Sequence, residues 1–256
     1  VGLTTDLRDV EQAEVVIISI GSQSLRALLA EAPMQALRDK TVVLCMKGLE
    51  MGTGERLSVI AGELLHPSCT VAVWLGPGHV QEFYRGIPNC MVIDSENEQV
   101  KRRLVQAFSS DLIRFYYGGD MIGNEVGAAA KNVVGIAAGF LDGVEMSSLK
   151  GALMSRGTRE VARLIRAMGG NELSAYGLCH LGDYEATVFS PYSHNRQFGE
   201  SFIRHQDYHR LAEGYYTVEA LMVLSERYQV ELPICRAVHA ILYENADPRE
   251  QLTDLL

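Results

Sequence analysis

Lys131 is the residue whose setting in this sequence best suits proton transfer. It is flanked at intervals of four by Gly123, Gly127, Gly135 and Gly139, so these positions form one ridge along a helix. Each glycine costs roughly 1 kcal/mol relative to alanine, which indicates that something approaches this backbone closely. A lysine there, with poor access to water, has a lowered pKa and can exchange a proton. The spacing fits equally a tight helix–helix crossing with Lys131 reaching to solvent.

Other candidate groups follow directly after predicted strands. Lys47 comes after one buried strand, Gly76 and Gly78 come after the next, and Gly21-Ser22 follows the first. In an open parallel sheet, ligands bind beyond the carboxyl ends of the strands. Lys47 is therefore well placed to meet an anion or a hydroxyl, although a solvated loop lysine and an ordinary Gly-Pro turn are the plainer alternatives.

The second half of the chain supplies further polar groups between apolar helices. They are Gly182-Asp183, Ser193-His194-Asn195-Arg196 and Glu213. Donors and carboxylates in such places suit a substrate site, and they also suit simple helix capping.

Two further patterns carry little chemistry. His205 and His209 lie four apart, but no third ligand stands at a recognisable spacing and no H-E-x-x-H occurs, so no metal site is expected. Cys179 and His180 are adjacent, and neighbours in sequence rarely face each other as a nucleophile pair.

The elements that must position these groups divide the chain in two. In the first part, short apolar runs predict strands over Val15–Ile20, Thr41–Met46, Cys69–Leu75, Cys90–Ile93 and Ile113–Tyr116. Helical patterns alternate with them over Ser22–Ala30, Arg56–Leu65 and Glu96–Phe108. Strands that are apolar on both faces require helices on both sides of a parallel sheet. We therefore predict a doubly wound α/β nucleotide-binding domain over residues 1–118.

The second part, residues 119–256, is predicted to be an all-helical substrate domain. Its helical patterns cover Met121–Leu141, Leu149–Met168, Tyr208–Tyr228, Pro233–Tyr243 and Pro248–Leu255. The run Ser190–Gly199 is polar and is expected to be a loop.

Bulk properties exclude several classes of protein. The 256 residues carry a net charge of -9, which disfavours nucleic acid and anionic membranes as partners. Five scattered cysteines without a C-x-x-C pair suit reduced thiols in a cytoplasm. No signal peptide is recognisable, and no apolar run approaches the roughly 20 residues of a membrane span.

Taken together, the motifs resemble those of bacterial NAD(P)-dependent glycerol-3-phosphate dehydrogenases. ISIGSQSLRALL, CMKGLE, LGPGHVQEF and GNEVGAAAKNVVGIAAGFLDG occur in the order of that family. So do LMSRGTREVARL, LGD, SHNRQFG, AEGYYTVEAL, ELPICRAVHAILYE and DPREQLTDLL, and the resemblance runs from about Thr4 to the last residue.

The resemblance implies hydride transfer between NAD or NADP and a small phosphorylated substrate, interconverting dihydroxyacetone phosphate and sn-glycerol 3-phosphate for glycerophospholipid synthesis. It implies that Lys131 is the general acid/base, that Lys47 touches substrate and cofactor, and that Asp183 binds the hydroxyl end of the substrate. Further substrate contacts would come from Gly76, Gly78, Ser193, His194 and Asn195, and cofactor contacts from Val80, His194, Leu211 and Glu213. The family is commonly dimeric.

The sequence departs from the family pattern where substrate should bind. Gly78 stands where the family has a serine, and His194 stands where it has an arginine. Arg196 is expected to compensate in part for that arginine. These changes leave open a dehydrogenase of another phosphorylated or acidic hydroxy compound, and a non-catalytic binding homologue.

A third departure concerns the cofactor. No G-x-G-x-x-G follows any strand, so about 60–70 residues, or two βα units, are expected to be missing ahead of Val1. We therefore expect this chain to bind cofactor poorly. The choice between NADH and NADPH would be made in that missing part.

Overall fold

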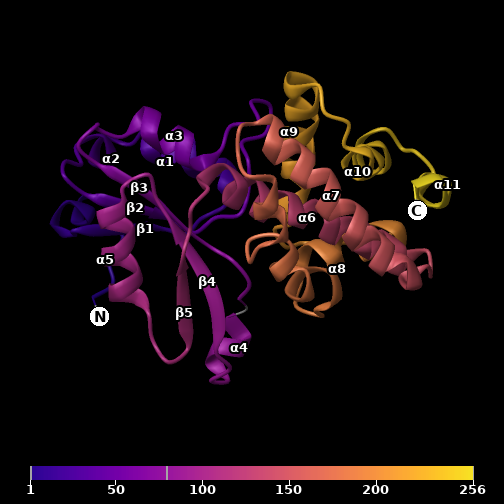
Figure 1. The fold of residues 1–256 in the computed structure, drawn as a ribbon, viewed down its shortest axis with the longest axis horizontal. Coiled ribbons are helices and arrows are strands. Elements are labelled where there is room, and N and C mark those ends of the chain that lie inside the picture. The colour runs from indigo at the N-terminus through magenta and orange to yellow at the C-terminus, as the bar shows by residue number, and fades with distance from the viewer. Residues whose placement is uncertain (1, 79, 256) are drawn as a thin grey trace.

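A five-stranded sheet forms the first part of the chain in the computed structural model, which describes residues 2–78 and 80–255 (Figure 1). Its strands lie side by side in sequence order: β1 (Val15–Ile18), β2 (Thr41–Leu44), β3 (Thr70–Leu75), β4 (Asn89–Asp94) and β5 (Ile113–Tyr117). Pairing is parallel throughout, except that β3 and β4 are antiparallel. Only the short helix α4 (Val80–Tyr84) separates β3 from β4. The chain therefore turns back there without the longer crossover that a parallel pair requires.

Helices cover both faces of the sheet, which confirms the doubly wound arrangement. On one face, α1 (Leu25–Leu29), α2 (Ala32–Gln35) and α3 (Leu57–Leu64) share a core with the inward side chains of β1, β2 and β3. On the other face, α5 (Glu98–Phe108) packs its Leu104 and Val105 against residues of β2 to β5. Short 3-10 turns, η1 (Leu7–Gln12) and η2 (Ser22–Ser24), flank β1.

The rest of the chain is helical, and no described residue from 119 to 255 lies in a strand. Its α-helices are α6 (Met121–Gly143), α7 (Lys150–Ala167), α8 (His194–Ile203), α9 (Glu213–Tyr228), α10 (Pro233–Tyr243) and α11 (Pro248–Leu255). Between them lie the short turns η3 (Ser147–Leu149), η4 (Glu172–Tyr176) and η5 (Leu181–Asp183) and a π-helix, η6 (Glu185–Phe189).

Two sequence predictions in this region need correction. The polar run Ser190–Gly199 is a loop only up to Ser193, because the Ser193 side chain accepts a hydrogen bond from the backbone N–H of Arg196 and so caps α8. The helix expected over Tyr208–Tyr228 begins only at Glu213. In both places the residues near the start of the helix are mostly polar. They show no hydrophobic periodicity, so the sequence did not indicate where the helix begins.

Helix α6 is the axis of the helical region and contacts α7, α8, α9 and α10. Its glycines make room for neighbouring protein groups. A side chain at Gly139 would collide with the backbone of Arg196 on α8, and one at Gly135 would meet Thr187 and Asn195. Lys131, however, is only 7% exposed. The glycines therefore do allow a tight helix–helix crossing. The other part of that interpretation, a Lys131 that reaches to solvent, is wrong.

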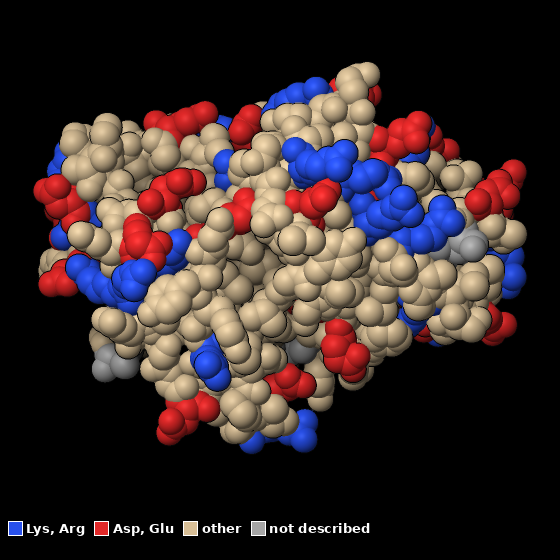
Figure 2. Space-filling model, in the orientation of Figure 1, with Lys and Arg blue, Asp and Glu red and all other residues tan. Residues whose placement is uncertain are grey.

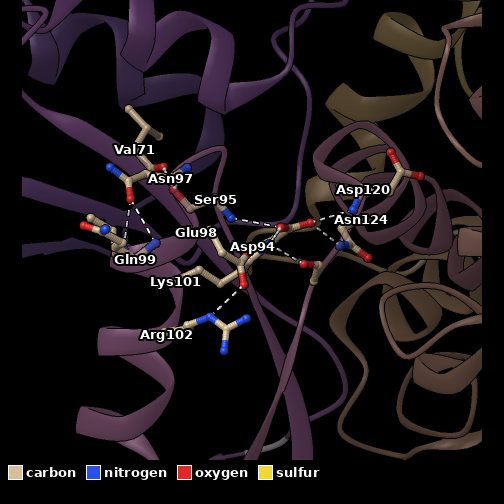
Figure 3. A network of polar contacts seen from close by, with 12 residues as sticks. Val71, Asp94, Ser95, Asn97, Glu98, Gln99, Lys101, Arg102, Asp120 and Asn124 are labelled. Carbon is tan, nitrogen blue, oxygen red and sulfur yellow. Dashed lines mark hydrogen bonds and ion pairs between the residues drawn. The ribbon is translucent and has the colours of Figure 1, made fainter.

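The crossing from sheet to α6 is held by the buried Asp94 at the end of β4 (Figure 3). Its carboxylate accepts hydrogen bonds from the backbone N–H of Asp120, at 3.0 Å, and from the Asn124 side chain, at 2.8 Å. Lys101 of α5 lies 3.4 Å from the same carboxylate and donates to the carbonyl of Gly118 at 2.6 Å. The direction in which α6 leaves the sheet is fixed by these bonds.

Carboxylates of the helical region also bind the sheet region directly. Glu125 of α6 accepts from Arg56, at 2.7 Å, and from the backbone N–H of Ser58 in the first turn of α3, at 2.9 Å. Glu213 of α9 accepts from the backbone N–H of Ser22 at 2.9 Å. A negative group near a helix N-terminus is stabilising. Carboxylates of the helical region therefore join it to the N-terminal turns of helices in the sheet region.

Charge is unevenly distributed over the surface. Figure 2 shows both signs mixed on one face, with a band of positive side chains over the part where Figure 1 shows α7. That helix exposes four arginines on one side: Arg156, Arg159, Arg163 and Arg166. The net negative charge therefore still allows local positive surface. Among the described helices, none has the length and apolar character needed to cross a membrane.

The crossing of α6 and α8 can be tested with two glycine substitutions. Gly139→Ala should lower the free energy of unfolding by about 2–3 kcal/mol, because the added methyl group meets the α8 backbone. The matched control is Gly151→Ala on α7, where the methyl group meets nothing within 4 Å and helix propensity should raise stability by up to about 1 kcal/mol. Urea unfolding measures both, and equal effects would contradict the crossing.

Candidate active site

A cavity of about 450 Å3 lies where the strand ends of the sheet meet the helical region. Its walls come from the segments after β1 and β2, from the start of α4, from the middle of α6 and from the residues around the starts of α8 and α9. Because β1, β2 and β3 are parallel, the segments that follow them lie at one edge of the sheet. This is the edge at which open α/β sheets bind ligands.

Most of the site residues predicted from the sequence line this one cavity: Lys47, Gly78, Val80, Lys131, Ser193, His194, Asn195, Leu211 and Glu213. Gly76 and Asp183 do not line it. Both instead accept hydrogen bonds from Lys47, which does. Gly76 accepts a hydrogen bond from the Lys47 ammonium through its carbonyl oxygen, at 2.6 Å. Asp183 is 1% exposed and lies behind the two lysines.

The buried carboxylate of Asp183 is shared by both lysines. Its Oδ2 atom lies 2.8 Å from the Nζ atom of Lys47 and 3.1 Å from that of Lys131. Lys47 reaches it from the sheet region and Lys131 from the middle of α6. One negative charge thus holds two ammonium groups side by side at the wall of the cavity.

Thr187 completes the surroundings of Lys131, and the sequence reasoning missed it. The Lys131 ammonium donates to the Thr187 hydroxyl at 2.7 Å, and that hydroxyl donates to the backbone carbonyl of Asp183, also at 2.7 Å. The sequence carried a signal only for its place beside Asp183, because Thr187 follows Asp183 by four residues and so lies on the same face of one helical turn. Two acceptors therefore orient the lysine.

Burial sets the protonation of Lys131. Removal from water lowers its pKa to about 8. The positive charge of Lys47 adds to this shift, and the negative charge of Asp183 opposes it. A lysine with this pKa exchanges its proton near neutral pH.

Another part of the cavity wall is the N-terminus of α8. Ser193 caps it, and the Asn195 side chain accepts from the backbone N–H of Gly214 at 2.9 Å, which ties α8 to α9. The His194 Nδ1 atom lies 2.8 Å from the hydroxyl of Tyr208. The N-terminus of a helix, where the helix dipole is positive, is a favourable place for an anion.

Arg196 does not take the place of the absent arginine. Its guanidinium is paired with Asp142 and with Glu200, each at 2.9 Å, on the side of α8 away from the cavity. Successive residues of a helix point about 100° apart, so Arg196 cannot share the direction of His194. The prediction that Arg196 partly compensates for the arginine absent at position 194 is therefore wrong.

Gly78 and the cofactor candidates complete the site. A side chain at Gly78 would come within 3.1 Å of the Phe83 ring, so the serine of the family pattern would need that ring to move. Val80 and Leu211 line the cavity and are 64% and 53% exposed. Glu213 lines the cavity and also binds Ser22. Within the described ranges, no cluster of three or more His, Cys, Asp or Glu side chains could hold a metal ion.

Comparison with known proteins identifies the family. The models described as NAD-dependent glycerol-3-phosphate dehydrogenase N-terminus and C-terminus match residues 1–101 and 120–253. The glycerol-3-phosphate dehydrogenases (NAD(P)+) of Thermotoga sp. (strain RQ2) and Chlorobium phaeobacteroides (strain BS1) are 33% and 34% identical, over 99% and 98% of this chain and 79% and 78% of theirs.

The structural comparison agrees. The crystal structure of glycerol-3-phosphate dehydrogenase from Coxiella burnetii superposes with a TM-score of 0.90 at 28% identity, over 98% of this chain and 79% of that one. A ketopantoate reductase from Ralstonia eutropha, at 14% identity and a TM-score of 0.59, shares the fold alone. The fold and the matches define an NAD(P)-dependent oxidoreductase. The chain belongs to the NAD-dependent glycerol-3-phosphate dehydrogenase family.

The burial of Lys131 predicts a pH dependence of stability. Its pKa is about 8 in the folded protein and ordinarily 10.5, so between these values the unfolded chain binds more protons than the folded one. The contribution of Lys131 to stability therefore rises with pH across this window and is least favourable below it. Urea unfolding of the wild type and of Lys131→Met at several pH values measures this contribution. A difference that stays constant with pH would contradict the lowered pKa.

Proposed function

We propose that this protein reduces dihydroxyacetone phosphate to sn-glycerol 3-phosphate with NADH or NADPH, using Lys131 as the general acid. The observation that carries the proposal is the buried Lys131, paired with Asp183 and Thr187 at the wall of a cavity beyond the strand ends. Family membership supports the reaction and the cofactor. Glycerophospholipid synthesis would use the product.

The residues present fit the nicotinamide end of the cofactor. Ile20, Met46, Val80 and Leu211 give the cavity apolar walls close to the two lysines, which suits a flat ring whose reactive carbon must lie near a carbonyl. The described residues contain no G-x-G-x-x-G loop for the pyrophosphate. When bound, the reduced cofactor supplies the hydride that the carbonyl carbon accepts.

Lys131 would supply the proton. In its charged form it donates to the carbonyl oxygen as negative charge develops there, and in the reverse reaction its neutral form accepts the proton of the hydroxyl. The pKa of about 8 places both forms within reach. Asp183 would stabilise the ammonium form, and Thr187 would hold the Nζ atom in one direction.

Lys47 would polarise the same oxygen while lying against both ligands. It is held by the Gly76 carbonyl and by Asp183, and the Lys47 backbone carbonyl accepts from Asn132 at 2.9 Å. These bonds would keep the ammonium in place without support from the substrate. The burial of Asp183 supports a role through the two lysines.

The phosphate of the substrate would lie at the N-terminus of α8, next to Ser193, His194 and Asn195. The positive end of the helix dipole favours an anion there.

Turnover with dihydroxyacetone phosphate and NADH or NADPH tests the proposal, with Lys131→Ala measured alongside. The variant should lose about 100-fold or more in kcat, the usual contribution of a general acid. The rate of reduction by the wild type should fall as pH rises through about 8, because Lys131 must be charged. Lys150→Met, which removes another buried, ion-paired lysine outside the cavity, is the control and should retain kcat. A folded protein that binds both ligands without turnover would instead be a binding homologue.

A second candidate is a dehydrogenase of another phosphorylated or acidic hydroxy compound. The observation that favours it is the pairing of Arg196 with Asp142 and Glu200, which leaves His194 without the help of a guanidinium.

His194→Arg distinguishes the two candidates. If dihydroxyacetone phosphate is the substrate, a permanently charged guanidinium should lower its KM roughly tenfold, while His66→Arg on the sheet region should leave KM unchanged. An unchanged or raised KM in His194→Arg, together with faster turnover of another hydroxy acid or ketone, would favour the second candidate.

We also propose that the chain divides near Gly118 into a nucleotide-binding domain, residues 1–118, and a substrate domain, residues 119–256. The uninterrupted helical character after that point supports this division.

We also place the protein in the cytoplasm, and its free cysteines support this compartment. We further propose a homodimer, which the exposed side chains of Leu173, Tyr176 and Phe189 support. A solution mass of one 28.2 kDa chain would contradict the dimer.

A further inference from the structure

A buried histidine and tyrosine connect α6 to the segment that carries Asp183. His180 and Tyr184 are both 0% exposed. The His180 Nδ1 atom lies 2.8 Å from the carbonyl oxygen of Gly127 on α6, and the Tyr184 hydroxyl lies 2.7 Å from His180 Nε2. The three groups form one buried series of hydrogen bonds.

The chemistry of the partners fixes the direction of these bonds. The carbonyl of Gly127 can only accept, so Nδ1 carries the proton and Nε2 accepts from the Tyr184 hydroxyl. Burial lowers the pKa of His180 to about 4, which keeps the ring neutral, and burial raises the pKa of Tyr184, which keeps its proton. Each donor in the chain therefore has one acceptor.

Two glycines provide the space for this pair. A side chain at Gly127 would lie 3.0 Å from the Cβ atom of His180, and one at Gly157 on α7 would lie 3.2 Å from the Tyr184 hydroxyl. Gly127 is a member of the glycine ridge, one turn before Lys131. Its place on the ridge is therefore explained by the histidine.

The two ends of this hydrogen-bonded series, Gly127 and Tyr184, lie close in sequence to Lys131 and to the groups that orient it. Gly127 is one helical turn from Lys131, while Tyr184 is adjacent to Asp183 and three residues from Thr187. The segment from His180 to Phe189 consists of the short turn η5 and the π-helix η6. Such short elements have few internal bonds, so their position depends on attachment to neighbouring helices.

We propose that His180 and Tyr184 are positioning residues, which hold Asp183 and Thr187 against Lys131 by tying their segment to α6. This inference rests on the proposed role of Lys131 in the reaction. Without the tie, the segment would move away from α6, and the Lys131 ammonium would lose its oriented acceptors. A misplacement of about 1 Å at such a group can cost on the order of 100-fold in rate.

The rival explanation is an ordinary polar pair of the core, which contributes to stability alone. Both explanations predict a less stable protein when the pair is broken, so stability cannot decide between them. The titration of Lys131 can, because it depends on the distance to Asp183. The titratable groups facing Lys131 are Asp183, Lys47, Cys179 and His180. Burial raises the pKa of Cys179 to about 12, so neither it nor the neutral His180 changes charge near pH 8.

The deciding variant is Tyr184→Phe, which removes one hydroxyl and keeps the ring. We expect kcat to fall about tenfold or more with little change in KM. The pH at which reduction declines should move below its wild-type position, because a more distant Asp183 supports the charged lysine less. His180→Asn, which keeps a donor near Gly127 and removes the acceptor for Tyr184, should behave in the same way. The double variant should be no worse than either single one.

Tyr243→Phe is the matched control. The Tyr243 hydroxyl donates to the carbonyl of Tyr215 at 2.7 Å, within the helical region and outside the cavity. Its loss should lower stability to a similar degree and leave kcat and the pH profile unchanged. If Tyr184→Phe matches this control in all three measurements, the positioning role is overturned.

A measurement without turnover separates this inference from the proposed function. The Lys131 resonance can be followed by NMR against pH in the full chain without substrate, after assignment with Lys131→Met. A lower pKa in Tyr184→Phe supports the tie even if dihydroxyacetone phosphate proves not to be the substrate. An unchanged pKa overturns it even if the wild type turns that substrate over.

Discussion

The site depends on one buried carboxylate shared by two lysines. Asp183 has almost no access to water, and its Oδ2 atom contacts Lys47 and Lys131 together. A single negative charge cannot fully neutralise two ammonium groups in a place from which water is excluded, so the more buried lysine holds its proton less tightly. Burial, with a smaller contribution from the positive charge of Lys47, lowers the pKa of Lys131 to about 8. This arrangement arises only because a loop of the sheet and two helical segments meet at one point.

The remainder of the structure keeps that meeting point fixed. Asp94 ties the start of α6 to the sheet, and Glu125 and Glu213 bind first-turn groups of the sheet region from the helical side. The glycines of α6 let α8 and the Asp183 segment approach its backbone. A single helix therefore carries the reactive lysine, the contact with α8 and the attachment to the sheet. We interpret its many glycines as the means by which those contacts share one surface.

The two ends of the cavity differ in how closely they follow the family pattern. The end with the lysines, Asp183 and Thr187 is complete, and its members hold one another through short hydrogen bonds. At the phosphate end, Gly78 and His194 replace the expected serine and arginine, and Arg196 is committed to acidic neighbours. The described residues thus support the proposed proton transfer, whereas the proposed binding of the phosphate would depend mainly on the N-terminus of α8.

The sequence by itself determined the fold class, the family and more than half of the residues that line the cavity, because buried strands, glycine spacing and family motifs are local patterns that survive without coordinates. It could not determine that β3 and β4 run antiparallel, that α8 starts within a polar run, or that Arg196 turns away from the cavity. Each of these depends on partners distant in the chain. The tertiary structure alone decided that Thr187 orients Lys131 and that His180 fills the space beside Gly127. Hydrogen bonds between segments some fifty residues apart leave no periodicity in the sequence.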